Sequence, residues 1–182
     1  MPGEQPRVAR TEIIPLERSF STLDVEAAAR MLASENPRGS EQLHIEQIWT
    51  QIRSRKKKQS LFDRITNGSG WGEQGQRQAP GRVRPVATTE PANDRQRTLA
   101  VAVLSGSRAS RLTGARKFFE PAVQDRAFEK GEQARKKLAS GVPLLKEERR
   151  FLGYRKRARD IRAEWLKKSA FLDTIDGVEF YT

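Results

Sequence analysis

The stretch Val25–Pro37, which reads VEAAARMLASENP, decides the fold that the sequence predicts. Its apolar residues recur at the spacing of one helix face. Pro37 forbids much extension beyond Glu35, because the residue before a proline is disfavoured in the α conformation. Thr22 or Asp24 can cap the start of the helix. We therefore expect a first helix that ends at about Glu35.

A second helix is predicted after a short turn, with Ser40 as its N-cap. Its apolar residues follow the pattern of a helix that buries one face: Ile45, Ile48, Trp49 and Ile52. The two helices are expected to form a tight hairpin with Trp49 in the core. His44 lies off this stripe, which favours a structural role, on the surface or half-buried, over a catalytic one.

The rest of the chain divides by composition. Gly, Pro, Gln and Thr dominate from Asn67 to about Pro91, and such a loop is too long for an idle connection. Residues 94–104 are apolar on nearly every side, which predicts the buried central helix. Helical patterning then continues to about Ser140, and a long basic helix is expected over residues 146–168.

The C-terminal region is predicted to dock on the core. An apolar seam runs along the expected last helix: Phe151, Tyr154, Ala158, Ile161 and Trp165. Its Arg and Lys face, with Arg155, Arg159 and Arg162, is expected to look outward. A short strand over residues 178–181 is expected after a turn at Asp176–Gly177.

The composition is basic and lacks cysteine. The 35 Lys and Arg residues against 23 Asp and Glu give a formal charge of +12, so the surface attracts polyanions: nucleic acid, an anionic membrane face or the polymers of bacterial envelopes. Without cysteine, and with His44 as the single histidine, the sequence predicts no disulfide, no metal site and no cofactor. Residues 1–20 form a polar arm without the apolar run of a secretory signal or transmembrane segment.

Glu35 is the candidate catalytic residue because of its position. A carboxyl group at the C-terminal end of a helix faces the negative pole of the helix dipole and unpaired carbonyl groups. This field and partial burial are expected to raise the pKa of Glu35, as a proton donor near neutral pH requires. The alternative is structural, with Glu35 paired to Arg38 or Arg53.

Four segments, in order, resemble the catalytic region of the spore-cortex-lytic cell-wall hydrolases. In the first, Val25–Glu35, an Ala-Arg pair precedes the glutamate as an Ala-Arg or Ala-Lys pair precedes the catalytic glutamate of the family. Residues 61–66 are similar to the segment before the family's cleft loop, residues 98–106 to its Ala-rich helix, and residues 114–121 to its aromatic pair followed by Pro. The resemblance covers about residues 22–121.

The resemblance implies a mainly α, lysozyme-like fold and cleavage of the glycan strand of peptidoglycan, typically by lytic transglycosylation, with Glu35 as the general acid/base. The expected organisation is a polar arm over residues 1–20, a lysozyme-like catalytic domain with a long Gly-rich loop over 21–121, and a basic helical extension over 122–182 packed on it. Peptidoglycan is the expected partner, with an anionic envelope polymer or a virion or injection-particle protein as a further one.

Substrate contacts are expected from the second helix and from the aromatic pair. The helix carries Thr50 and Gln51 where members of the family usually have a Leu-Asn-Arg type ending. Either residue is therefore expected to hold a sugar or to order Glu35. The pair Phe118 and Phe119 matches the aromatic pair of the family and is expected to contact the substrate.

The Gly-rich loop offers two further candidates. Trp71 has a flat face for stacking on a sugar ring, or alternatively forms a lid on the core. Glu73 is the most plausible second carboxylate, followed by Asp63 and Glu90, and the alternative for each is a solvated surface acid. The single-acid mechanism is therefore favoured, in which a hydroxyl group of the sugar itself attacks.

Two other functions stay open: a basic nucleic-acid-binding protein, and an inactive lysozyme-like structural protein of a phage or injection particle. The sequence contains no zinc pattern, no RNA-binding aromatic motif and no clear helix-turn-helix, so only its charge favours nucleic acid. Without a signal peptide, the enzyme is expected to be made in the cytoplasm. A particle, a holin or another non-classical route would deliver it to the cell wall, as for a phage lysin.

Overall fold

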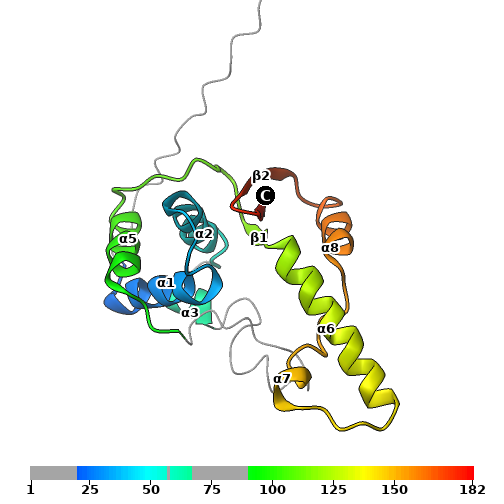
Figure 1. Cartoon of the computed structure of the whole chain (residues 1–182). Helices are drawn as coiled ribbons and strands as arrows, with labels where there is room; N and C mark the ends of the chain where they lie inside the picture. Colours follow the sequence, from blue (N-terminus) through cyan, green and yellow to red (C-terminus); the bar gives the residue numbers. More distant parts are fainter. Residues whose placement is uncertain (1–19, 57, 67–89) are drawn as a thin grey trace, which may run out of the picture.

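The computed structural model describes residues 20–56, 58–66 and 90–182. In this part of the chain the fold is mainly helical, with seven helices and one small three-stranded sheet (Figure 1). The elements are α1 (Thr22–Glu35), α2 (Glu41–Arg53), α3 (Leu61–Thr66), α5 (Asp94–Leu104), β1 (Lys117–Phe119), α6 (Pro121–Ala139), α7 (Lys146–Arg149), α8 (Ala158–Trp165), β2 (Phe171–Ile175) and β3 (Val178–Tyr181).

α1 ends at Glu35 as predicted, but Ser21 caps its start, and neither predicted residue is the N-cap. Ser21 Oγ accepts from the backbone N–H of Asp24 at 3.2 Å, and Asp24 Oδ2 accepts from that of Ser21 at 2.9 Å. Asp24 is buried, and its Oδ1 accepts from the backbone N–H of Phe62 at 2.7 Å. One carboxylate therefore caps α1 and fastens α3 to it.

The central helix of the fold is α2, and the prediction that residues 94–104 fill this place is wrong. Every residue of α2 from Leu43 to Ile52 is buried, polar ones included. α5 has the predicted bounds, but it buries one face only, and Val101 is 51 % exposed. An apolar sequence does not identify the central helix here, because polar side chains can also be buried when they find partners inside the protein.

Glu46 is the polar side chain that fixes α2 most firmly. Its Oε1 accepts from the backbone N–H of Arg111 and from Gln42 Nε2, each at 2.6 Å. Its Oε2 accepts from Ser110 Oγ at 2.5 Å and from the backbone N–H of Leu112 at 3.4 Å. The carboxylate is fully buried, so these donors replace water as its solvent. Glu46 thereby ties α2 to the segment that follows α5.

Two hydrophobic cores lie on either side of α2. The larger one joins α1, α2, α3 and α5, and includes Met31, Leu32, Ile48, Trp49, Leu61 and Val103. The smaller one joins Leu43 of α2 to Ala115, Val178 and Phe180. α2 therefore connects the helical half of the molecule to the sheet (Figure 1).

The sheet has the order β1-β3-β2, and both pairings are antiparallel. The strand over residues 178–181 and the preceding turn at Asp176–Gly177 are confirmed, and both turn residues have positive φ, 49° and 78°. The two partner strands were not predicted. Because β3 lies between β1 and β2, the end of the described chain is built into the middle of the sheet.

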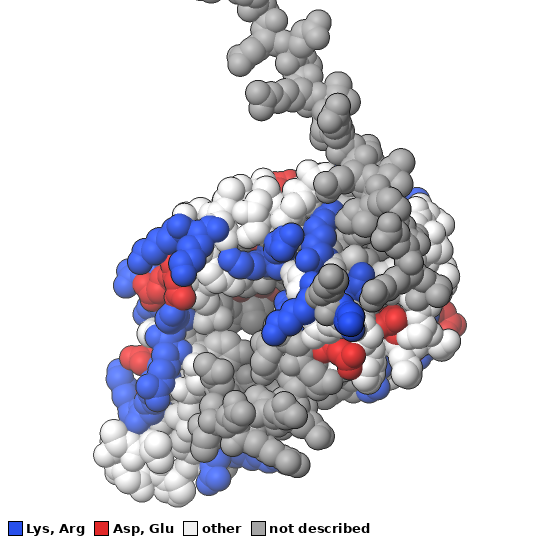
Figure 2. Space-filling model, turned by 180° about the vertical axis from the view of Figure 1, so that it is seen from behind, with Lys and Arg blue, Asp and Glu red and all other residues white. Residues whose placement is uncertain are grey.

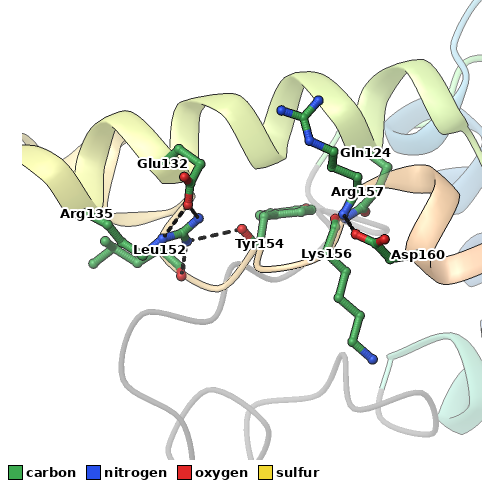
Figure 3. A network of polar contacts seen from close by, with 8 residues as sticks. All are labelled: Gln124, Glu132, Arg135, Leu152, Tyr154, Lys156, Arg157 and Asp160. Atoms are coloured by element: carbon green, nitrogen blue, oxygen red, sulfur yellow. Dashed lines mark hydrogen bonds and ion pairs between the residues drawn. The ribbon is translucent and has the colours of Figure 1, made fainter.

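The long helix expected over residues 146–168 is two short helices, α7 and α8, so this prediction is wrong. Residues 150–157 between them form turns and extended chain. The seam from Phe151 to Trp165 therefore does not lie along one helix. Arg135 of α6 donates from Nη1 to the carbonyl oxygens of Leu152 and Tyr154, each at 3.1 Å, and so holds this connection in its non-helical path (Figure 3).

Arg162, expected on an outward basic face, is bonded to β3. Its Nε donates to both carboxylate oxygens of Glu179, at 3.0 and 2.9 Å, and Nη2 donates to Oε1 as well. Tyr181 Oη donates to Glu179 Oε2 at 2.7 Å. This network fastens α8 to β3. None of the helices within the described ranges is long and apolar enough to span a membrane.

Candidate active site

Glu35 occupies the C-terminal end of α1 as a largely buried carboxyl group. Its Oε1 is inaccessible to solvent and has no hydrogen-bond partner among the described residues. Among the described residues, no ion pair joins Glu35 to Arg38 or to Arg53. The pKa of Glu35 is raised to about 7. Burial is the larger cause, and the negative charge of Glu120 is the smaller one. A carboxyl group with this pKa can both donate and accept a proton near neutral pH.

Glu120 is the acid whose negative charge acts on Glu35. It is the N-cap residue of α6 and directly follows β1. A negative charge is favoured at the N-terminus of a helix and disfavoured at the C-terminus. Glu35 at the C-terminus of α1 and Glu120 at the N-terminus of α6 therefore lie at helix ends of opposite polarity.

Tyr154 is half-buried in the connection between α7 and α8. Burial raises the pKa of its phenol, and the charge of Glu35 raises it in addition. Arg150 acts on the phenol in the opposite direction. The phenol and the Glu35 carboxyl therefore lie within electrostatic reach of each other.

One face of α2 follows the end of α1. His44 Nε2 donates to the carbonyl oxygen of Asn36, the residue after Glu35, at 2.7 Å. Gln47 lies one turn farther along the same face and is fully buried, yet neither atom of its amide has a hydrogen-bond partner among the described residues. Thr50 Oγ1 is also buried and has no hydrogen-bond partner among the described residues. Buried polar groups of this kind are places where water or a ligand hydroxyl can bind.

The candidate substrate-binding residues lie in different surroundings. Thr50 is 1 % exposed, and Gln51 Oε1 accepts from Arg64 Nε at 3.1 Å, so Gln51 links α2 to α3. The ring of Phe118 packs against Phe180. The contacts of Gln51 and Phe118 serve the fold, and a role of all three residues in substrate binding stays a prediction.

Phe119 belongs to an aromatic cluster at the sheet. Its ring lies 5.1 Å from that of Trp165 and 6.1 Å from that of Tyr181, measured between centroids. Trp49, expected in the core, is 5 % exposed, and its Nε1 donates to the backbone carbonyl of Arg108. Trp71 and Glu73 lie outside the described residues.

The other two candidate acids lie apart from each other. Asp63 is exposed, and its Oδ2 accepts from Ser60 Oγ at the start of α3. The backbone N–H of Glu90 donates to Ser34 Oγ at 3.3 Å, so Glu90 lies beside the residue that precedes Glu35. Its own side chain is exposed.

Sequence reasoning missed Glu120, Tyr154 and Gln47. Glu120 stands inside a segment that carries the resemblance, but nothing in its spacing shows that it meets Glu35. Tyr154 lies beyond that segment, in a stretch predicted as helix. Gln47 gave no signal, because it lies on the face of His44 and off the apolar stripe that the sequence predicted to be buried.

The described residues include no group of three or more His, Asp or Glu side chains that could hold a metal ion. Burial lowers the pKa of His44, which keeps the ring neutral, and its Nε2 is occupied by the Asn36 carbonyl. Known protein families, curated proteins and solved structures give no match to the chain.

Proposed function

We propose that the protein cleaves the glycan strand of peptidoglycan, with Glu35 as the general acid/base. The observation that carries the proposal is a largely buried carboxyl group whose pKa is raised to about 7 and whose Oε1 has no partner among the described residues. A carboxyl group that only stabilised the fold would be expected to have a cation or several hydrogen-bond donors beside it.

The mechanism uses both protonation states of Glu35. The protonated carboxyl donates its proton to the leaving oxygen of the glycosidic bond as that bond breaks. Where a hydroxyl group of the sugar attacks, the resulting Glu35 carboxylate takes its proton, and where water attacks on the inverting route, a second carboxylate takes the proton of the water. If a hydroxyl of the sugar attacks, the product is an anhydro sugar, and if water attacks, the product is heavier by one water molecule.

Glu120 is the acid that could activate water in the second case. It is the carboxylate whose charge acts on Glu35, and a general base on the opposite side of the bond is what inverting hydrolysis requires. The resemblance to lytic transglycosylases favours the first case. The mass of the released fragments distinguishes the two.

Zymography on purified peptidoglycan tests the proposal. Glu35→Gln is expected to abolish lysis, since the amide keeps the size of the side chain but cannot donate a proton at neutral pH. General acid catalysis contributes about 10²- to 10⁴-fold, so a loss smaller than about tenfold contradicts the assignment. Glu129→Gln is the matched control, because Glu129 is an exposed acid of α6 with no ion pair among the described residues. It should lyse as the wild type does.

The basic charge supports a proposal about where the enzyme acts. With +12 formal charges it is attracted to anionic envelope polymers, and this attraction would hold it on the wall. Delivery by a particle, a holin or another non-classical route belongs to the same proposal. Nucleic acid would also be attracted by charge, but the buried acid at Glu35 has no use in such a protein.

A further inference from the structure

α6 and the chain that returns along it form an arm, whose far end points away from α1, α2, α5 and the sheet (Figure 1). Besides Arg135, Gln124 holds the returning chain, since its Nε2 donates to the carbonyl oxygen of Lys156 at 2.6 Å. Gly131 allows the close approach, because a Cβ atom there would lie 2.5 Å from the carbonyl oxygen of Phe151. The arm is therefore fixed along its length by its own contacts.

The far end of the arm buries little of its chain. The buried residues of α6 are Ala127, Gly131 and Ala134, which all precede its last turn. Every residue of the run 136–143 is exposed. Leu144 is then buried and fastens the turn that follows α6. The residues before it are thus exposed in a turn that is itself anchored.

A Schellman motif gives this turn its shape. Gly141 has a φ of 73°, and its N–H donates to the carbonyl oxygen of Leu138 at 3.1 Å. The N–H of Val142 donates to the carbonyl oxygen of Lys137 at 3.0 Å. The residue in the place of Val142 usually packs on an apolar residue of the last helical turn, but here that turn carries Lys136 and Lys137. The backbone fixes the turn, and Val142 stays on the surface.

Three large apolar side chains, which we call the apolar tip, are exposed at this end. Leu138 is 57 % exposed, Val142 46 % and Leu145 66 %. Figure 2 shows the end of the arm as an uncharged surface with Lys and Arg beside it. Residues 136–150 contain two acids and five cations: Glu147 and Glu148, and Lys136, Lys137, Lys146, Arg149 and Arg150. The surroundings of the apolar tip are therefore positive.

Apolar side chains among cations fit the surface of an anionic lipid bilayer. Such a surface buries apolar side chains at the boundary between headgroups and acyl chains, and its charge attracts Lys and Arg. Nucleic acid and glycan strands offer no apolar layer to the tip. A stable interface with another protein buries about 800 Å² on each side, which is more than one projecting turn provides.

We propose that the apolar tip inserts into the surface of an anionic lipid bilayer, with Lys136 and Lys146 at the headgroups. The arm holds the tip away from the rest of the molecule, which stays in water. The proposal goes beyond the cleavage of peptidoglycan and does not depend on it.

Sedimentation of the full chain with lipid vesicles tests the proposal. The wild type should bind vesicles made of equal parts of phosphatidylglycerol and phosphatidylcholine at least about tenfold more tightly than phosphatidylcholine alone. The double variant Val142→Ser with Leu145→Ser should lose about tenfold or more in affinity for the anionic vesicles, because lipid would bury both side chains. The matched control is Val101→Ser with Leu23→Ser, which removes an exposed valine from α5 and an exposed leucine from α1. It should bind as the wild type does.

A fluorescent label reports which part of the protein meets the lipid. The chain contains no cysteine, so Leu145→Cys and Leu23→Cys each provide one site for an environment-sensitive fluorophore. On anionic vesicles, emission from position 145 should shift to shorter wavelength, and emission from position 23 should not. Circular dichroism checks that each variant is folded. If the double variant of the tip does not fold, the labelled proteins still decide the question.

Absence of binding of the wild type to anionic vesicles overturns the proposal, and this is the result expected if the tip instead docks on a protein. Equal binding of the two double variants overturns it as well, as do equal emission shifts at the two labelled positions. Binding to phosphatidylcholine as tight as to the anionic vesicles overturns the role of the cations. The vesicles contain no peptidoglycan, so these results are independent of the proposed lysis.

Discussion

At the scale of residues, Gly39 decides how closely α1 and α2 approach. A Cβ atom there would lie 2.9 Å from His44 Nε2, 2.9 Å from Leu43 Cδ2 and 3.2 Å from the carbonyl oxygen of Asn36. His44 cannot move away without losing its hydrogen bond to Asn36. The tight turn behind Glu35 therefore depends on the absence of a side chain.

Gly39→Ala should destabilise the protein by about 1–3 kcal/mol, the usual cost of overpacking a closed site. Urea unfolding measures this change. Gly141→Ala is the comparison, since its Cβ would meet nothing within 4 Å and only the positive φ of 73° opposes it. If Gly39→Ala is as stable as the wild type, the turn is looser than its contacts indicate.

The raised pKa of Glu35 also predicts how stability depends on pH. The carboxyl group has an ordinary value of 4.5 unfolded and about 7 folded, so the folded state binds the proton more tightly. Its contribution to stability is therefore present below pH 4.5 and is lost as pH rises toward 7. Above pH 7, Glu35→Gln should be more stable than the wild type, on the order of 1–3 kcal/mol.

Denaturant unfolding at pH 4 and pH 8 measures this difference, which should be small at the lower pH. If Glu35 serves function at a cost to stability, Glu35→Gln should be more stable than the wild type and inactive. Equal stability of the two proteins at pH 8 would show that Glu35 is well solvated. Glu129→Gln should leave the profile unchanged.

At the scale of elements, the helices that were predicted well carry local signals. The end of α1 at Glu35 follows from Pro37, the start of α2 from Ser40, and α6 ends before Gly141 as its pattern indicated. The break between α7 and α8 has no comparable signal. It depends on Arg135 and the other α6 contacts, which join residues distant in sequence, and a helical period within the segment cannot reveal them.

Glu46 gives the element-scale prediction. Glu46→Gln turns an amide N–H₂ group toward donors that the carboxylate now satisfies, so we expect a loss of about 1–3 kcal/mol and a looser α2. Glu41→Gln changes the same helix at its exposed ion pair with Arg108, and this change should lower the free energy of unfolding by only about 0–1 kcal/mol. Melting temperatures of the two variants compare the sites. A smaller loss for Glu46→Gln than for Glu41→Gln would contradict the assigned role of the buried carboxylate.

At the scale of the whole molecule, the positive charge is distributed over several elements. Figure 2 shows Lys and Arg side chains along the edge formed by α6 and α8, with acids among them. Many cations of this region have partners within the protein, including Arg135, Lys137, Lys156 and Arg162. The outward basic surface is therefore narrower than the sequence suggested.

Substitution of an exposed cation and substitution of a cation paired within the protein are therefore expected to have different effects. Changing Arg155 and Arg159 together to Gln should weaken retention on wall sacculi, because both are exposed, and added salt should remove the difference since such charges are screened over about 8–10 Å. Arg162→Gln should instead lower the melting temperature, because it breaks the network with Glu179. Equal retention of the double variant and the wild type at every salt concentration would exclude a role of this surface in targeting.

The candidate site shows the same limit on what sequence can predict. Glu35 could be chosen from its place at a helix end, which is a local property. Glu120 and Tyr154 come within electrostatic reach of it only through the folding of α6 and the connection bound to it, 85 and 119 positions along the chain from Glu35. Their coupling to Glu35 depends on the three-dimensional arrangement.

The central place of β3 in the sheet also governs when the protein can fold during its synthesis. β1 and β2 do not pair with each other, so within the described sheet neither has a partner strand until residues 178–181 have left the ribosome. Until then the smaller core lacks Val178 and Phe180, and Arg162 lacks Glu179. A nascent chain therefore carries α1, α2 and Glu35 well before the sheet can close. Ribosome-bound chains should therefore show the proposed lytic activity only after residues 178–181 have emerged from the exit tunnel.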